Sequence, residues 1–202
     1  MKIYWNLFDD IISLENLFKA WEEFRKGKQS KPDVQHFERN LEENIFKLHL
    51  DLVNKTYKHG PYHSFYIQDP KQRLIHKATV RDRVLHHAIF AKLNPIFEPT
   101  FISHSFSCRI GKGTHKGVEA VTKMLRQVSG NGTKPCFVLK GDIRKFFQSV
   151  NHARLLEILA RKVKDPDVLW LLREVVNTLI GVGSERERER ERERPAGYQL
   201  VI

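Results

Sequence analysis

The stretch Cys136–His152 constrains the fold most strongly, because a short apolar run ends there in one acid that is followed by cations and aromatic residues. Residues 136–139 are apolar and β-prone, and Lys140 and Gly141 allow the backbone to turn before Asp142. Short apolar runs bounded by turn residues are typical of buried strands. The pattern therefore predicts a strand over residues 136–139 whose end brings Asp142 to the surface of the protein.

Asp142 has two interpretations on these residues alone. A carboxylate at a strand end can hold a divalent cation of the magnesium type, which takes oxygen ligands and bridges to substrate phosphates. The neighbouring cations Lys140, Arg144 and Lys145 would suit a site that handles phosphates. The alternative is an ordinary aspartate that caps the following turn. An isolated Asp-x-x-x-Phe-Phe pattern does not decide between the two.

With its continuation to His152, this stretch resembles the first catalytic motif of reverse transcriptases of the group II intron and retron type. That motif combines an apolar strand, an aspartate, an apolar residue, two aromatics and a closing histidine, at the positions of Asp142, Ile143, Phe146, Phe147 and His152. The resemblance implies that Asp142 is a catalytic ligand of Mg²⁺. It also implies that the Phe147 ring closes against the sugar 2′ position and excludes ribonucleotides. The backbone around Ile143 would hold a second metal ion or the triphosphate.

A β-hairpin is predicted upstream, because residues 62–67 and 73–76 are β-prone and flank a turn that contains proline. Lys71 and Arg73 lie at its tip. In the enzymes that the chain resembles, a matching hairpin of the fingers clamps the incoming nucleoside triphosphate. Cations on edge strands also occur simply because they prevent aggregation, so this segment alone leaves both interpretations open.

Two further basic segments follow the hairpin. Thr79 and Asp82 have the spacing of a capping box, which predicts a helix that runs through Leu93. Arg81 and Arg83 lie in its first turn, where cations are unfavourable, so we expect them to have a role beyond helix stability.

The segment Ser105–His115 resembles a stretch of the same reverse transcriptases that precedes a helix. This implies that Arg109 and Lys112 contact the backbone of the template or nucleotide, and Thr114 is predicted to cap the following helix, which runs through Leu125. The Gly-Lys-Gly-Thr sequence within it lacks the spacing of a Walker phosphate loop.

Helices are predicted at both ends of the globular part. Apolar residues at three-and-four spacing predict one amphipathic helix over residues 3–24 and a second helix, capped by Asp33, that runs through Leu52. Asn151 and Asp165-Pro166 open two later helices, the second over residues 168–180. We expect these two to cover the palm sheet of a polymerase.

The charge of the chain favours nucleic acid as a partner. The formal net charge is +11, and removing the balanced Glu-Arg run of residues 185–194 from the 35 basic and 24 acidic residues leaves 30 and 19. Such a surface attracts phosphates in a salt-dependent manner.

The ten histidines lack the spacing of a metal or hydrolase site, and two cysteines favour a reducing compartment. The sequence has no apolar run of the ~20 residues that a membrane span needs and no secretory pattern, so we expect a cytoplasmic protein without membrane contact.

The carboxyl end departs from a globular pattern. The Glu-Arg repeat supports a helix poorly, so it is either a flexible charged tail or the product of slippage in a GA-dinucleotide tract that shifted the reading frame. The aromatic-x-Asp-Asp motif, which supplies the second catalytic carboxylate in the family, does not occur in the expected place. Two-metal catalysis needs that second carboxylate. We therefore predict that this chain alone does not polymerise DNA.

These observations predict an α+β fold with polymerase fingers and an incomplete palm, built from many helices, a β-hairpin and a partial antiparallel sheet. The expected regions are an amino-terminal helical region (1–60), fingers (61–135), a partial palm (136–183) and a charged tail (184–202). The resemblance implies an RNA-directed DNA polymerase, with Mg²⁺ as cofactor in the intact parent and an RNA template, a DNA primer and dNTPs as partners. A structured retroelement RNA is a further candidate partner. Two alternatives are a basic nucleic-acid-binding protein that has lost catalysis and a basic interaction module without salt-dependent affinity for RNA or DNA.

Overall fold

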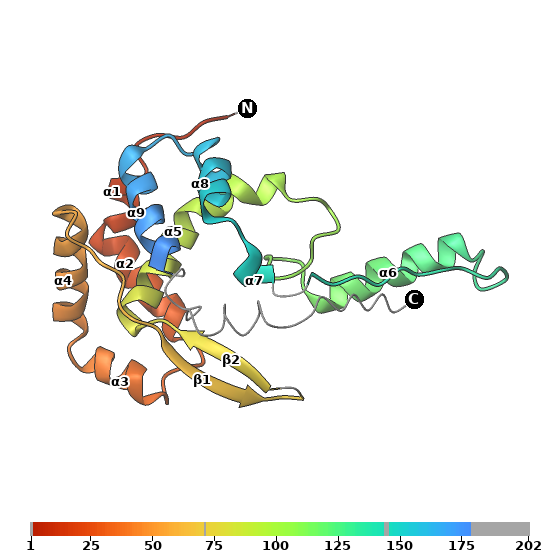
Figure 1. The fold of residues 1–202 in the computed structure, drawn as a ribbon, viewed down its shortest axis with the longest axis horizontal. Helices are drawn as coiled ribbons and strands as arrows, with labels where there is room; N and C mark the ends of the chain where they lie inside the picture. The colour runs from red at the N-terminus through yellow and green to blue at the C-terminus, as the bar shows by residue number, and fades with distance from the viewer. Residues whose placement is uncertain (1, 71, 144–145, 179–202) are drawn as a thin grey trace, which may run out of the picture. The chain divides into compact units, whose positions relative to one another are not determined.

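The structure is a computed structural model that describes residues 2–70, 72–143 and 146–178, without the side chains of Phe147 and Gln148. The chain forms two compact units. Unit 1 combines the described parts of Met1–Lys92 and Phe147–Ile202, and unit 2 is the described part of Leu93–Phe146. The fold is rich in helices and contains a small antiparallel sheet, as the α+β prediction requires (Figure 1).

The amino-terminal region contains four helices where the sequence predicted two. They are α1 (Phe8–Ile12), α2 (Leu14–Arg25), α3 (Pro32–Arg39) and α4 (Leu41–Val53). Ser13 leaves the helical conformation and accepts a hydrogen bond from the Asn16 N–H at 3.3 Å, which starts α2. Asn40 also leaves the helical conformation, with φ −123° and ψ 43°, and separates α3 from α4 without a side-chain cap. Both breaks fall inside a continuous apolar periodicity, so the pattern alone did not reveal them.

Asp33 does not cap α3 as predicted. The helix begins at Pro32, which suits the first helical position because proline has no backbone N–H to leave unpaired. The Asp33 carboxylate instead pairs with Lys77 at 2.8 Å and with Arg83 at 2.5 Å. Partial burial acts to raise the pKa of Asp33, but these two cations together hold it below its usual value.

The predicted β-hairpin is confirmed. Strands β1 (His63–Gln68) and β2 (Gln72–Lys77) are antiparallel, with His63 opposite Lys77 and Gln68 opposite Gln72. Helix α5 (Val80–Phe97) follows directly, and a 3₁₀ turn, η1 (Glu98–Thr100), follows α5. Thr79 accepts a hydrogen bond from the Asp82 N–H at 3.2 Å, which confirms the predicted start of α5.

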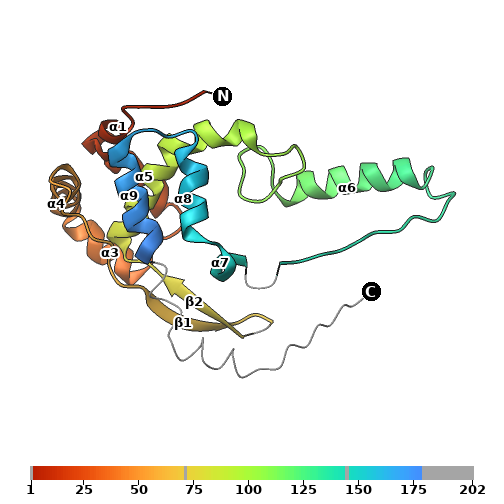
Figure 2. The ribbon, with the colours of Figure 1, turned by 45° about the horizontal axis from the view of Figure 1, so that its top comes forward.

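The core of unit 1 joins both ends of the chain. Helix α9 (Pro166–Asn177) lies beside the amino-terminal helices in both views (Figures 1 and 2). Asp165 caps α9 by accepting hydrogen bonds from the N–H groups of Asp167 and Val168, and its other oxygen accepts from Leu7 and Phe8 at 2.7 and 3.0 Å. Burial of the carboxylate acts to raise the pKa of Asp165, but these four donors together lower it. Leu171 and Val176 of α9 are buried, as are Trp21 of α2 and Leu48 of α4.

The helices at 152–177 were expected to cover a palm sheet, and this stays a prediction, because the described residues contain no such sheet. Helix α8 (His152–Ala160) is capped by Asn151 as predicted and packs on α9, and α9 packs on α1 through an edge contact between Trp170 and Phe8. The sheet of the described residues has only the two strands of the hairpin. A hydrophobic face needs a cover, and in this chain the amino-terminal helices provide it.

Unit 2 contains helix α6 (Thr114–Val128) and long connecting segments. The helix is preceded by Gly113 at φ +98°, so Thr114 is its first residue and not its cap. The strand predicted over residues 136–139 does not form, and the Phe137 and Leu139 side chains are both 98% exposed. An isolated extended segment gains no ladder of hydrogen bonds without a neighbouring strand. None of the described helices has the length and apolar character needed to cross a bilayer.

Candidate nucleic-acid interface

Asp142 lies in the extended segment before the short helix α7 (Phe146–Ser149). Its side chain and that of Ile143 are exposed, and they belong to unit 2, whereas Phe147 belongs to unit 1. The described residues contain no group of three or more histidines, cysteines or acids that could hold a metal ion. In the sequence Asp142 is the one acid of this motif, and its carboxylate is exposed. Lys71 and the side chain of Phe147 lie outside the described residues.

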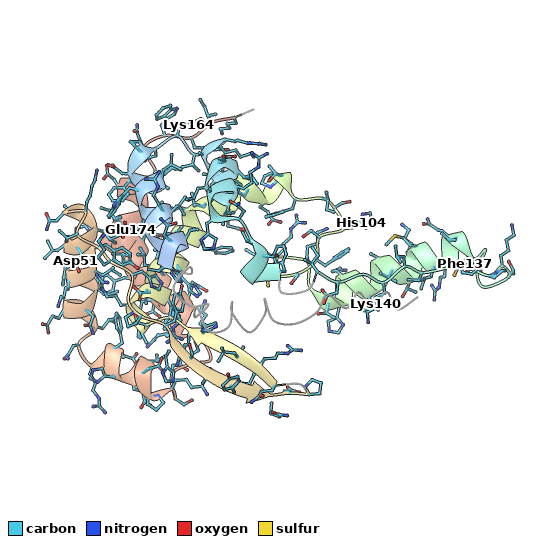
Figure 3. The ribbon with its side chains drawn as sticks, in the orientation of Figure 1. Asp51, His104, Phe137, Lys140, Lys164 and Glu174 are labelled. Carbon is cyan, nitrogen blue, oxygen red and sulfur yellow. The ribbon has the colours of Figure 1, made fainter. Side chains whose placement is uncertain are left out.

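Arg81 and Arg83 each bind a carboxylate of the amino-terminal helical region. Arg81 pairs with Asp51 of α4 at 2.6 Å and lies over the Tyr57 ring at 4.9 Å (Asp51 is labelled in Figure 3). Arg83 pairs with Asp33 and lies over the Phe24 ring at 4.8 Å. These contacts give both arginines a role beyond helix stability, because they fix the first turn of α5 to α3 and α4. Their contact with phosphate stays a prediction.

Asp82, which the sequence indicated only as part of a helix cap, is a buried carboxylate that joins three segments of unit 1. Asp82 is 0% exposed and accepts hydrogen bonds from the Tyr57 hydroxyl at 2.8 Å, the Thr79 hydroxyl at 2.6 Å and the Gly60 N–H at 3.0 Å. Burial raises the pKa of Tyr57, and the nearby Asp82 charge raises it further. Asp82 thereby joins the end of α4, the entry to the hairpin and the start of α5.

Gly60 is required at this junction by close approach. A Cβ atom there would lie 2.9 Å from both the Asp82 Oδ2 and the Thr79 Cγ2 atoms, which is too close for any side chain. The Thr79-x-x-Asp82 spacing was the sequence signal for this cluster. The spacing predicts the local cap, but the contacts with Tyr57 and Gly60 span 25 and 22 residues.

Two histidines pack beside Asp82. The His59 Nδ1 atom lies 3.8 Å from the Asp82 Oδ2 atom, and the His59 ring stacks on His86 at 5.3 Å. Burial lowers the pKa of His86 to about 4, and the nearby His59 acts in the same direction. The His86 Nε2 atom has no hydrogen-bond partner among the described residues. His86 is thus a neutral packed side chain at physiological pH.

Arg109 and Lys112 organise the loop of residues 98–113 in unit 2. Arg109 is only 12% exposed, pairs with Glu98 at 2.8 Å and donates to the carbonyls of Ile102 and Ser105 at 3.0 and 2.9 Å. Lys112 donates to the Ser103 carbonyl at 2.9 Å. Most of the Arg109 donors are used inside the protein, so direct backbone contact by Arg109 would require that loop to rearrange. Contact of either residue with nucleic acid stays a prediction.

Arg73 differs from the other predicted phosphate contacts. It lies exposed on β2, and no ion pair joins it to a described residue. The base of the same hairpin is fixed, because Lys77 pairs with Asp33 and Asp82 binds the Gly60 N–H. Of the predicted cations that the structure describes, Arg73 therefore has its charged group most available for a ligand.

Comparison with known proteins identifies the relatives of this chain. No family model matches it. It is 29% identical over 129 residues to the group II intron-encoded protein LtrA of Lactococcus lactis subsp. cremoris, which covers 61% of this chain and 20% of LtrA. It is 22% identical over 157 residues to the nuclear intron maturase 2, mitochondrial, of Arabidopsis thaliana, covering 70% of this chain and 20% of the maturase. Protein YkfC of Escherichia coli K12 is 25% identical over 128 residues, covering 62% of this chain and 33% of that protein.

These relatives confirm the resemblance to the group II intron family that the motifs indicated. Their names identify a group II intron-encoded protein and an intron maturase, and the similarity covers about 60% of this chain. The chain spans a third or less of the length of these relatives.

Proposed function

We propose that this chain, a homologue of group II intron-encoded proteins, is the fingers and the first part of the palm of an RNA-directed DNA polymerase. The observation that carries the proposal is the order of the motifs. A basic hairpin, the Arg81-Asp82-Arg83 helix start, the Arg109–Lys112 loop and the Asp142 motif follow one another as in the reverse transcriptases that the chain resembles. The proposed partners are an RNA template, a primer and dNTPs.

The described residues do not complete a metal site for this reaction. Asp142 and the backbone carbonyl of Ile143 offer two oxygen ligands, which suit Mg²⁺, an ion that usually keeps several waters. Nucleotidyl transfer by two metals needs at least one more carboxylate close to Asp142, and the described residues contain no group of three or more histidines, cysteines or acids that could hold a metal ion. The chain alone is therefore proposed to be inactive in polymerisation.

The proposed role of unit 1 is to hold the hairpin for nucleotide binding. Arg73, and Lys71 outside the described residues, would contact the triphosphate through charge-assisted hydrogen bonds. Arg81 and Arg83 would act as positioning residues, because their carboxylate partners fix the helix that follows the hairpin.

A second candidate is a nucleic-acid-binding protein without catalysis. The lone exposed Asp142 carboxylate favours it, since the cations of the chain are present while the metal site is incomplete among the described residues. Both candidates predict salt-dependent RNA binding. They differ in whether restoring the downstream sequence restores polymerisation.

The experiment that separates them is primer extension on an RNA template with Mg²⁺. It compares this chain, the product read in the restored frame beyond the Glu-Arg repeat, and Asp142→Ala in the restored product. The repeat itself lies outside the described residues. Extension by the restored product that disappears with Asp142→Ala supports the polymerase, whereas RNA binding without extension in any form supports the second candidate.

A further inference from the structure

We propose that the polar face of α6 binds the sugar–phosphate backbone of RNA, through residues other than Asp142 and the cations of the hairpin. The inference rests on the proposed function for the class of ligand, namely RNA. It is carried by the charge pattern of the helix, by the shape of its surface and by the availability of its cations.

Helix α6 has two different faces. Four apolar side chains with three-and-four spacing form one face and are exposed: Val118, Val121, Leu125 and Val128. The other face carries Lys116, Lys123 and Arg126, and Lys112 precedes the helix in the connecting loop. Glu119 is the single acid of the helix. The polar face therefore has an excess of positive charge arranged along one line.

The polar face borders two adjoining depressions that share Glu119 and Lys123. One has a volume of about 310 Å³ and is lined by the Phe106–Lys112 loop and Lys116, and the other has a volume of about 620 Å³ and extends past Arg126 to Asn131. A helix of 15 residues is about 22 Å long.

The cations of this face are available to a ligand. Within the described ranges, Lys123 and Arg126 have neither an ion pair nor a hydrogen bond with another side chain. Lys116 pairs with Glu119 at 2.9 Å, but both side chains are more than half exposed, so a phosphate can replace the carboxylate. Thr122 and Gln127 line the same depression and can donate hydrogen bonds to phosphate or sugar oxygens. Such donors fix position on a backbone without reading its sequence.

An amphipathic helix with cations can also lie on an anionic membrane. The described face favours RNA over a lipid surface for two reasons. The lining of the depressions includes the polar side chains of Glu119, Thr122 and Gln127. The relatives with informative names are intron proteins. Binding to anionic vesicles is kept as an outcome of the test.

The test uses the whole chain and charge reversal on two faces. The α6 variant is Lys123→Glu with Arg126→Glu, and its matched control is Lys47→Glu with Arg39→Glu, which makes the same charge change at exposed positions on α4 and α3. Fluorescence anisotropy measures the affinity for a single-stranded RNA of ~20 nucleotides between ~50 and ~200 mM salt. A neutral variant, Lys123→Gln with Arg126→Gln, and circular dichroism check that the fold is retained.

The proposal expects the α6 variant to bind RNA about tenfold more weakly and its salt slope to fall by about 1.4, since each phosphate contact to a single strand contributes ~0.7. The control should stay within about twofold of the unchanged chain. Equal affinity of the α6 variant and the unchanged chain overturns this inference and leaves the proposed function standing. An equal loss in the control variant, or a loss confined to anionic vesicles, also overturns it. If the unchanged chain shows no salt-dependent RNA binding, the proposed function fails first.

Discussion

The two compact units of this protein use the same residue types in opposite ways. In unit 1 the arginines of the α5 start are paired with Asp51 and Asp33, and the acid between them, Asp82, is fully buried and saturated with donors. In unit 2, Lys123 and Arg126 have no side-chain partner among the described residues, and the apolar side chains of α6 are exposed. A basic motif in the sequence therefore indicates either internal support or a ligand site, and only the surrounding acids distinguish the two.

The two units also differ in the exposure of their apolar residues. Leu171 and Leu48 are fully buried in unit 1, whereas Phe137 and Leu139 in unit 2 are exposed in an extended segment (Phe137 is labelled in Figure 3). Exposed apolar groups next to unpaired backbone favour aggregation. Unit 1 therefore has a packed core, whereas unit 2 leaves these apolar side chains exposed.

The largest effect is expected from removing the buried carboxylate of unit 1. Asp82→Ala leaves the Tyr57 hydroxyl, the Thr79 hydroxyl and the Gly60 N–H without their acceptor. We expect the free energy of unfolding to fall by roughly 3–5 kcal/mol, because buried donors without partners are costly. Urea denaturation followed by circular dichroism measures this change.

The matched control for Asp82 is Asp69→Ala, at an exposed position in the hairpin turn. Exposed substitutions of this kind change stability by less than about 0.5 kcal/mol. An Asp82 variant as stable as this control would mean that the junction between α4, the hairpin and α5 does not depend on the carboxylate.

Truncating one leucine in each unit tests the contrast between them directly. Leu171→Ala opens a cavity in a packed core and should lower the free energy of unfolding by about 2–5 kcal/mol. Leu139→Ala removes a side chain that is 98% exposed and should change it by less than about 0.5 kcal/mol. The same urea titration measures both variants. Equal losses would show that residues 136–139 are packed in solution and that the contrast is wrong.

The sequence predicted those parts of the fold that depend on local chemistry. The hairpin followed from β-prone runs around a turn, and the starts of α5, α8 and α9 followed from Thr79, Asn151 and Asp165, whose side chains bind N–H groups two or three residues away. The breaks at Ser13 and Asn40 escaped because the apolar periodicity continues through them. The strand at 136–139 was predicted wrongly because strand formation depends on a partner elsewhere in the chain.

The candidate site was predictable to a smaller extent. The family motifs located the cations and Asp142, but their partners are set by contacts over 30 residues for Arg81 and 50 for Arg83. No periodicity or spacing encodes such contacts. At Asp82 the sequence indicated only a local helix cap. Its hydrogen bonds with Tyr57 and Gly60 depend on the tertiary fold and could not be predicted from the spacing of residues.

The smallest expected effect is a dependence of unit 1 stability on pH through His86. Burial lowers the pKa of folded His86 to about 4, below the value of 6.5 for a free histidine. Between these values the unfolded chain binds a proton that the folded chain does not, so stability falls as the pH drops from about 6.5 to about 4. The loss approaches ~3 kcal/mol at its full extent.

Replacing His86 with leucine, which cannot be protonated, should flatten the stability profile in this window. The control His36→Leu, at an exposed position of α3, should retain the slope. The carboxylates Asp33 and Asp165 have lowered pKa values, so their stabilising effect is lost only as the pH falls below about 4. Their effect therefore lies below the pH range in which His86 acts. Urea titrations at pH 7, 5.5 and 4.5 measure the profile, and an unchanged slope in His86→Leu would show that His86 does not cause the dependence.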